Sequence, residues 1–246
     1  MLFEDPPIVG RFIRRYKRFF ADVEVDGEVI TAHCPNTGSL MGCKVEGATA
    51  WLRDSKDPKR KLRYTWQGIE VDGVWINIDT GVPNRVVAEA LAAGEVPGLE
   101  QYTESKREVK YGENSRIDVL LKGDGLPDCY VEVKNTTLAE PPTAMFPDGV
   151  TARGLKHLGE LIKMVAQGHR AVQFFFVSRD DVDVFRPADS IDPAYANGLR
   201  EAAEAGVEIR VFTTKVEPQS LTLSREIEIV LGERVAIPVG GKRRKK

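Results

Sequence analysis

The chain has 246 residues, of which 42% are hydrophobic and 29% are charged, a composition that suits one large globular domain or two modest ones. No apolar run approaches the length needed to span a bilayer, and the first residues lack the basic and then apolar order of a signal sequence, so we expect a cytoplasmic protein. The three cysteines share no metal-ligand or redox spacing and are interpreted as packing residues in a reducing compartment.

Cations alternate with aromatic residues in the segment RFIRRYKRFF, residues 11–20. A basic groove with aromatic platforms is what binding to a nucleic-acid backbone and its bases requires. The alternative is an amphipathic strand with buried aromatic residues and solvated cations. We favour burial for Phe19 and Phe20 and nucleic-acid binding for the cations, which are Arg11, Arg14, Arg15, Lys17 and Arg18.

The net charge of −2 hides an uneven distribution of cations. Five of the 35 basic side chains lie in the last five residues, so residues 1–241 carry 30 basic against 37 acidic side chains. A second basic cluster lies at residues 53–63. We expect residues 241–246 to form a disordered basic tail, because they offer no apolar side chain to bury.

Two patterns divide the chain. Residues 10–80 hold short runs of alternating polarity separated by Asp-Gly, Glu-Gly and Asn-Thr-Gly turns, which predicts a small antiparallel barrel of the OB type over residues 1–82. Helical periods follow, one capped by Asn84 and ended by Gly94, and another, over residues 151–168, ended by Gly168. With the apolar strands between and after them, residues 83–240 are predicted to form a mixed α/β domain.

Acidic side chains interrupt a predicted hairpin, RIDVLLKGDGLPDCYVEVK, residues 116–134. If its turn centres on Gly125, Asp118 and Glu132 lie opposite each other on one face of the two strands. The opposite face is then apolar and suited to packing against a helix. Its residues are Ile117, Val119, Leu121, Val131 and Val133.

Two facing carboxylates repel each other unless a proton or a cation lies between them. A hard ion such as Mg²⁺ or Mn²⁺ binds to one or two carboxylates and keeps several waters, and Lys134 projects from the same face as Glu132. Such a metal with a neighbouring ammonium group suits phosphodiester hydrolysis. The alternative, which the spacing leaves open, is a solvated hairpin face on which Asp118 forms a surface ion pair with Lys134 or Arg116.

The order of Asp118, a turn, and Glu132-Val-Lys134 resembles the PD-(D/E)xK nuclease superfamily, with Ile117 in place of the proline. The longer strings ENSRIDVLL, YVEVKNTTL and FPDGVTARGLKHLGEL resemble the sugar fermentation stimulation protein A family, as do HCPNTGSL and INIDTGVPNRVVAEAL. This resemblance covers nearly the whole chain. It implies an N-terminal OB-type barrel, a C-terminal nuclease-like domain, and non-sequence-specific DNA binding linked to regulation of sugar (maltose) metabolism.

The two helices add candidate site residues. The resemblance makes Glu89 a further acid of the catalytic site, and the alternative is a surface pair with Arg85 one helical turn away. In the second helix, three basic or imidazole side chains share one face with Glu160, and we expect them to contact DNA; a solvated face is the alternative. They are Arg153, Lys156 and His157.

The loops PNTGSL and DTGVPN are predicted turns in which Gly38 and Gly81 have positive φ and nearby polar side chains bind backbone amides. Because both loops belong to the family resemblance, we expect their polar residues to line a cleft between the domains, near the carboxylates. These residues are Asn36, Thr37, Asp79 and Asn84.

Together these features predict a DNA-binding protein, with RNA as an alternative substrate, that has a metal-dependent nuclease site. The metal ligands are Asp118 and Glu132, and the catalytic residues are these two with Lys134 and Glu89. One rival is a non-catalytic transcriptional regulator or nucleoid-associated protein that retains the nuclease fold. Another is a scaffold that recruits proteins by its edge strands.

Overall fold

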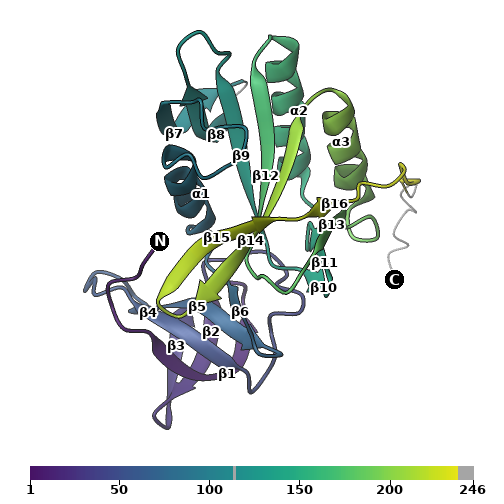
Figure 1. Ribbon diagram of the computed structural model, residues 1–246. Coiled ribbons are helices and arrows are strands. Elements are labelled where there is room, and N and C mark those ends of the chain that lie inside the picture. Colours follow the sequence, from purple (N-terminus) through teal and green to yellow (C-terminus); the bar gives the residue numbers. More distant parts are fainter. Residues whose placement is uncertain (113–114, 238–246) are drawn as a thin grey trace.

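The N-terminal part of the chain forms a closed β-barrel (Figure 1). The computed structural model describes residues 1–112 and 115–237. Its strands follow the order β3-β2-β1-β4-β5-β6, and a parallel pairing of β3 with β5 closes a five-stranded, OB-like barrel to which β6 is added. The strands are β1 (Ile8–Tyr16), β2 (Phe20–Val25), β3 (Glu28–His33), β4 (Thr49–Asp54), β5 (Tyr64–Val71) and β6 (Val74–Asn77).

Local sequence explains the barrel's hairpins and its core. The Asp26-Gly27 turn joins β2 to β3 with positive φ at both residues, which is the two-residue turn that matches the twist of paired strands. Phe12 stacks on Trp66 in the barrel core, with ring centroids 4.8 Å apart. The prediction that Phe19 is buried was wrong. Phe19 lies in the turn between β1 and β2, where it is 48% exposed.

The rest of the described chain forms an α/β domain around a six-stranded sheet of order β15-β14-β12-β9-β8-β7. Three of its strands, β9, β12 and β14, run parallel to one another. Helix α1 (Pro83–Ala92) covers one face, and α2 (Ala152–Ala166) and α3 (Pro193–Glu204) cover the other (Figure 1). The sheet strands are β7 (Glu104–Tyr111), β8 (Ser115–Lys122), β9 (Cys129–Thr136), β12 (Arg170–Val177), β14 (Glu208–Glu217) and β15 (Ser220–Glu226).

A smaller sheet of order β10-β11-β13-β16 lies beside the main one. Its strands are β10 (Ala139–Glu140), β11 (Thr143–Phe146), β13 (Val184–Pro187) and β16 (Glu228–Ile229). Helix α2 begins where the Thr151 side chain accepts a hydrogen bond from Gly154 N, and it ends before Gly168, which has a φ of 87°. The predicted tail, residues 241–246, lies outside the described residues.

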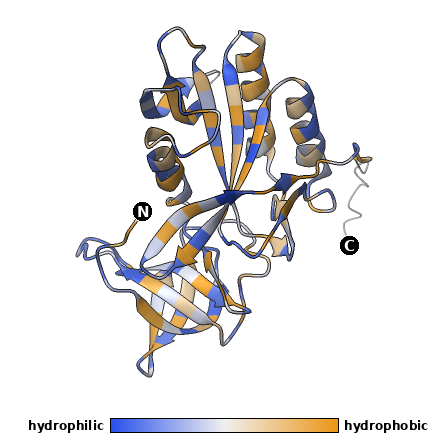
Figure 2. Cartoon of the chain, in the orientation of Figure 1, coloured by the Kyte–Doolittle hydropathy of each residue, from blue (hydrophilic) through white to orange (hydrophobic). Residues whose placement is uncertain are grey.

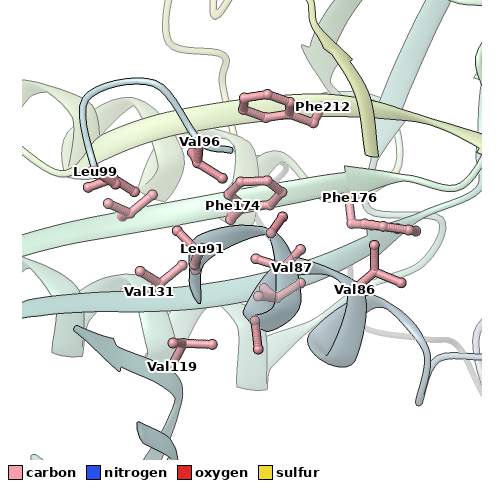
Figure 3. Close-up of a cluster of buried hydrophobic side chains, with 14 of the residues drawn as sticks. Val86, Val87, Leu91, Val96, Leu99, Val119, Val131, Phe174, Phe176 and Phe212 are labelled. Atoms are coloured by element: carbon pink, nitrogen blue, oxygen red, sulfur yellow. The ribbon is translucent and has the colours of Figure 1, made fainter. Parts of the chain in front are cut away.

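Each face of the main sheet carries a cluster of buried apolar side chains, and in Figure 2 orange residues recur along its strands among white and blue ones. Phe174 and Phe176 of β12 pack towards α1 (Figure 3), whereas Phe175 between them packs towards α2 and α3. Each of these rings is fully buried and contributes about 1.5–3 kcal/mol through removal from water. One detail of the hairpin prediction was wrong: Ile117 belongs to the cluster on the α2 side, not to the α1 side with Val119.

Hydrogen bonds join the barrel to the α/β domain. Asn77 N, at the end of β6, donates to Ser178 O over 3.0 Å. Leu40 N donates to Asp148 Oδ2 over 2.9 Å, and Ser39 Oγ donates to Asp148 O. The two contacts with Asp148 fix the barrel loop of Ser39 and Leu40 against the segment that precedes α2. The candidate site lies between this loop and the α/β domain.

None of the helices in the described ranges 1–112 and 115–237 is long and apolar enough to cross a lipid bilayer.

Candidate metal centre

The hairpin of β8 and β9 has the predicted register. Its last paired residues are Val119 and Val131, so Asp118 and Glu132 occupy the next opposite positions. There the backbone ladder stops, and Asp118 Oδ2 instead accepts a hydrogen bond from Val133 N at 2.7 Å. The two strands therefore separate at the carboxylates, and the Asp118 side chain satisfies a backbone amide that has lost its ladder partner.

Asn84 holds the second oxygen of Asp118. Its Nδ2 donates to Asp118 Oδ1 over 2.6 Å. The prediction of Asn84 as the helix cap was wrong, since α1 starts at Pro83 and the cap position belongs to Val82, which makes no side-chain cap bond. Proline at the first helical position needs no amide partner, which leaves the Asn84 side chain available to the site.

Glu132 is the centre of a buried cluster that joins β9 to α2. Its side chain is 3% exposed, and its Oε1 accepts a hydrogen bond from Lys134 Nζ at 2.5 Å and contacts His157 Nδ1 closely. Arg153 Nε lies 3.4 Å from His157 Nε2. Because arginine can only donate, a neutral His157 with its proton on Nδ1 satisfies both contacts, accepting from Arg153 and donating to Glu132.

The two carboxyl groups have opposite electrostatic environments. Burial and the nearby Glu132 charge raise the pKa of Asp118 to about 6. Burial also acts to raise the pKa of Glu132, but the hydrogen bond from His157 and the charge and hydrogen bond of Lys134 outweigh it and lower that pKa. Glu132 is thus held as a carboxylate while Asp118 carries the cost of their repulsion.

The carboxylate oxygens of this site suit a hard cation as ligands. Glu132 Oε2 is buried and has no hydrogen-bond partner among the described residues, although a buried carboxylate oxygen normally has one. A cation between this oxygen and Asp118 would satisfy it and remove the repulsion. Within the described ranges no group of three or more His, Cys, Asp or Glu side chains could hold a metal, so the site offers two carboxylates and leaves positions for water.

These side chains line a cavity of about 390 Å³ between the two domains, which we call the metal cavity. The α/β domain contributes Asp118, Glu132 and Lys134. Of the four residues predicted to line a cleft near the carboxylates, three do so, namely Asn36, Thr37 and Asn84.

Asp79 lies elsewhere, in a separate cavity with Arg53. Its Oδ1 accepts a hydrogen bond from Gly81 N at 2.8 Å, and its Oδ2 lies 3.7 Å from the Arg53 guanidinium. The predicted side-chain turns are therefore present, but the predicted positive φ at Gly38 and Gly81 is wrong. Gly38 instead allows a close approach of the domains, because a Cβ there would lie 2.9 Å from Asp148 Oδ2.

Glu89 does not reach the metal cavity. It is exposed and pairs with Arg85 over 2.9 Å, which is the alternative that the sequence had left open. Glu89 lies five positions after Asn84, so in a helix their side chains point about 140° apart. Because Asn84 points into the metal cavity, Glu89 points away from it.

The five cations of residues 11–18 divide into three kinds. Arg11 pairs with Glu24, and Arg14 pairs with Asp22 over 2.9 Å. The Arg15 guanidinium donates to Asn36 O and Gly38 O, at 2.7 and 2.9 Å, so it braces the barrel loop that lines the metal cavity. The other two, Lys17 and Arg18, are exposed in the turn between β1 and β2.

The predicted polar face of α2 lies against the site. Arg153 and Lys156 are exposed, but His157 and Glu160 are buried, so the alternative of a fully solvated face is wrong. Sequence reasoning missed Asn135 and Asp148, which also line the metal cavity. The signal for both was the family resemblance, since YVEVKNTTL contains the first and FPDGVTARGLKHLGEL the second.

Comparisons with known proteins cover both domains. Residues 13–78 match the model of the SfsA N-terminal OB domain, and residues 81–220 match that of the sugar fermentation stimulation protein RE domain. A sugar fermentation stimulation protein homolog of Maricaulis maris is 50% identical over 235 residues, 95% of this chain and 100% of that one. The homolog of Geotalea uraniireducens is 51% identical over 226 residues, 91% and 97% of the two chains.

A solved structure is also similar. The structure of Pyrococcus furiosus SfsA in complex with Ca²⁺ superposes on this fold with a TM-score of 0.85 and 31% sequence identity. The match covers 94% of this chain and 98% of that one, so it includes both the barrel and the α/β domain.

Proposed function

This chain belongs to the sugar fermentation stimulation protein family, whose RE domain is nuclease-like, and from this premise we propose that it is a metal-dependent phosphodiesterase that acts on nucleic acid. One observation carries the proposal. Asp118, Glu132 and Lys134 converge in the metal cavity, and a buried oxygen of Glu132 has no partner among the described residues. The Ca²⁺ complex of the Pyrococcus furiosus relative supports a hard cation, because Ca²⁺ and Mg²⁺ both prefer oxygen ligands.

In this proposal Asp118 and Glu132 hold the metal, which is Mg²⁺ or Mn²⁺. When bound there, the metal would polarise a phosphoryl oxygen and lower the pKa of a coordinated water. Asn84 orients Asp118, and His157 orients Glu132, through the hydrogen bonds described above. The Lys134 ammonium lies beside Glu132 and is placed to stabilise the charge that develops on the phosphate.

The substrate in this proposal is DNA, with RNA as the alternative. Phosphate contacts come from exposed cations, namely Lys17 and Arg18 of the barrel and Arg153 and Lys156 of α2. Such contacts carry no base information, so we expect binding without sequence preference. We assign the protein to the cytoplasm, and we place any regulation of maltose metabolism downstream of nucleic-acid binding.

The proposal predicts cleavage that requires a divalent metal. The wild type is incubated with labelled single- and double-stranded DNA and RNA in Mg²⁺, in Mn²⁺ and in EDTA, and products are expected only with a metal. Binding of these substrates without cleavage of any would favour the non-catalytic regulator. In the same series, the four contacts named above predict by themselves that affinity for a single strand falls roughly fiftyfold between 50 and 200 mM salt, and any further phosphate contact adds to this fall. Affinity that is insensitive to salt would contradict those contacts.

A further inference from the structure

The metal cavity has neighbours on both sides. One, of about 560 Å³, shares Asn84, Asp118 and Glu132 with it and extends to Arg116 and Lys156; we call it the helix-side cavity. The other, of about 580 Å³, shares Thr37 and Asp148 with it and extends to Arg18 and Lys44; we call it the barrel-side cavity. Because each neighbour shares lining residues with the metal cavity, the three cavities lie side by side, and we call them together the groove.

Cations lie on each side of the middle of this groove. The middle holds the two carboxylates of the metal site together with Lys134 and Arg153. The helix-side cavity adds Arg116 and Lys156 beside Glu108, and the barrel-side cavity adds Arg18 and Lys44, with Asp148 in the wall that it shares with the metal cavity. A chain of phosphates that crosses the metal site would therefore meet cations on both sides of the phosphate at the metal. A small anion would need only one of these positions, so the layout fits a polymer.

One exposed apolar side chain lines the barrel end of the groove, and an exposed aromatic ring follows one of its cations in the chain. Val150 lines the barrel-side cavity and is 82% exposed. Phe19 is not a lining residue, but it follows Arg18 in the turn between β1 and β2 and is 48% exposed. Exposed aromatic and apolar side chains beside cations suit unpaired bases, because base stacking on an aromatic ring contributes about 1–3 kcal/mol per base. In a continuous duplex the bases are already stacked on one another and cannot use this surface.

The middle of the groove is also deep. The Glu132 side chain is 3% exposed, and the cavity walls come from both domains, which Asp148 ties together through Leu40 N. A phosphate on the outside of an intact duplex would have to enter this recess while its partner strand stayed outside. We propose that the groove binds one unpaired strand of nucleic acid across the metal site, so that the substrate is single-stranded DNA or the single-stranded end of a duplex.

The statement that this strand is a substrate rests on the proposed function, whereas binding of the strand can be measured in the absence of cleavage. Fluorescence anisotropy in EDTA measures binding of a labelled single strand, of the same sequence as a blunt duplex, and of a duplex with a single-stranded overhang. We expect the single strand and the overhang to bind at least tenfold more tightly than the blunt duplex.

Two variants probe the two ends of the groove. Lys44→Glu and Arg116→Glu are each expected to weaken single-strand binding about tenfold at low salt, because each replaces a phosphate contact by a repulsion. Arg107→Glu is the matched control, since Arg107 is exposed on β7, beside β8, and lines none of the three cavities. It should change the affinity less than twofold.

Equal affinity for the blunt duplex and the single strand would overturn the inference, as would a control variant that loses as much as the groove variants. Neither result would affect metal-dependent cleavage by the wild type, which tests the proposed function separately. Conversely, if the groove variants weaken single-strand binding as expected but the wild type cleaves no substrate, the proposed strand-binding groove is supported and the proposed nuclease activity is contradicted.

Discussion

Lys134→Met is expected to reduce metal-dependent cleavage by roughly a hundredfold to a thousandfold, the usual loss when one charged group that stabilises a transition state is removed. Methionine keeps the apolar length of the side chain and removes the ammonium. Since Lys134 Nζ now contacts Glu132 Oε1, a cation bound at Glu132 loses a competitor, and the variant should bind Mg²⁺ or Mn²⁺ at least as tightly as the wild type. Single-turnover cleavage and metal titration on the same preparation measure both effects.

The control for this experiment is Lys122→Met. Lys122 is the last residue of β8, where it pairs with Asp128 at the other end of the hairpin from the carboxylates. Its loss should leave cleavage within about twofold, because a surface ion pair of this kind contributes little. Wild-type rates from Lys134→Met would contradict the role given to the ammonium, whereas loss of metal binding in that variant would show that Lys134 maintains the site's structure.

Metal-free Asp118→Asn is expected to gain stability relative to the wild type as the pH rises from about 4 to 7. Folding raises the pKa of Asp118 from 3.8 to about 6, through burial and the Glu132 charge. Between these values the folded state binds more protons than the unfolded state, so wild-type stability falls as the pH rises through this window. Asparagine does not titrate, and the difference between the two proteins should change by roughly 2–3 kcal/mol.

Urea unfolding in EDTA at pH 4, 5.5 and 7 measures this change. Asparagine offers only one oxygen to the two donors that Asp118 now serves, so a constant loss is expected at every pH; only the trend with pH is diagnostic. Asp124→Asn, in the exposed turn of the same hairpin, should show no such trend. A difference between Asp118→Asn and wild type that is flat from pH 4 to 7 would contradict the repulsion between the two carboxyl groups.

The sequence could predict the features that depend on local periodicity. The register of the hairpin followed from its turn and from the alternation of its strands, and it placed Asp118 opposite Glu132 before any tertiary contact was known. The ends of the two helices at Gly94 and Gly168 followed from the position of these glycines after helical repeats, and both glycines have positive φ in the structure. The order of barrel and α/β domain followed from the change of period near residue 84.

Contacts between distant segments could not be predicted in this way. Asn84 had the residue type of a helix cap, yet its amide lies against Asp118, 34 residues later in the chain. His157 and Glu160 were predicted to share a polar helix face with Arg153 and Lys156 that contacts DNA, but both are buried, and His157 contacts Glu132 of the sheet. The Asp79 side chain lies beside Arg53 and not in the metal cavity, because its hydrogen bond from Gly81 N fixes the direction of the carboxylate. The division of the domains at residue 82 stays a prediction.

Isothermal titration of the wild type with Mn²⁺ tests the central claim most directly. We expect one binding site, which is lost in Asp118→Asn and in Glu132→Gln and retained in Lys134→Met. Heat of binding that is absent from the wild type at millimolar Mn²⁺, or that survives in both carboxylate variants, would contradict the assignment of Asp118 and Glu132 as the metal ligands.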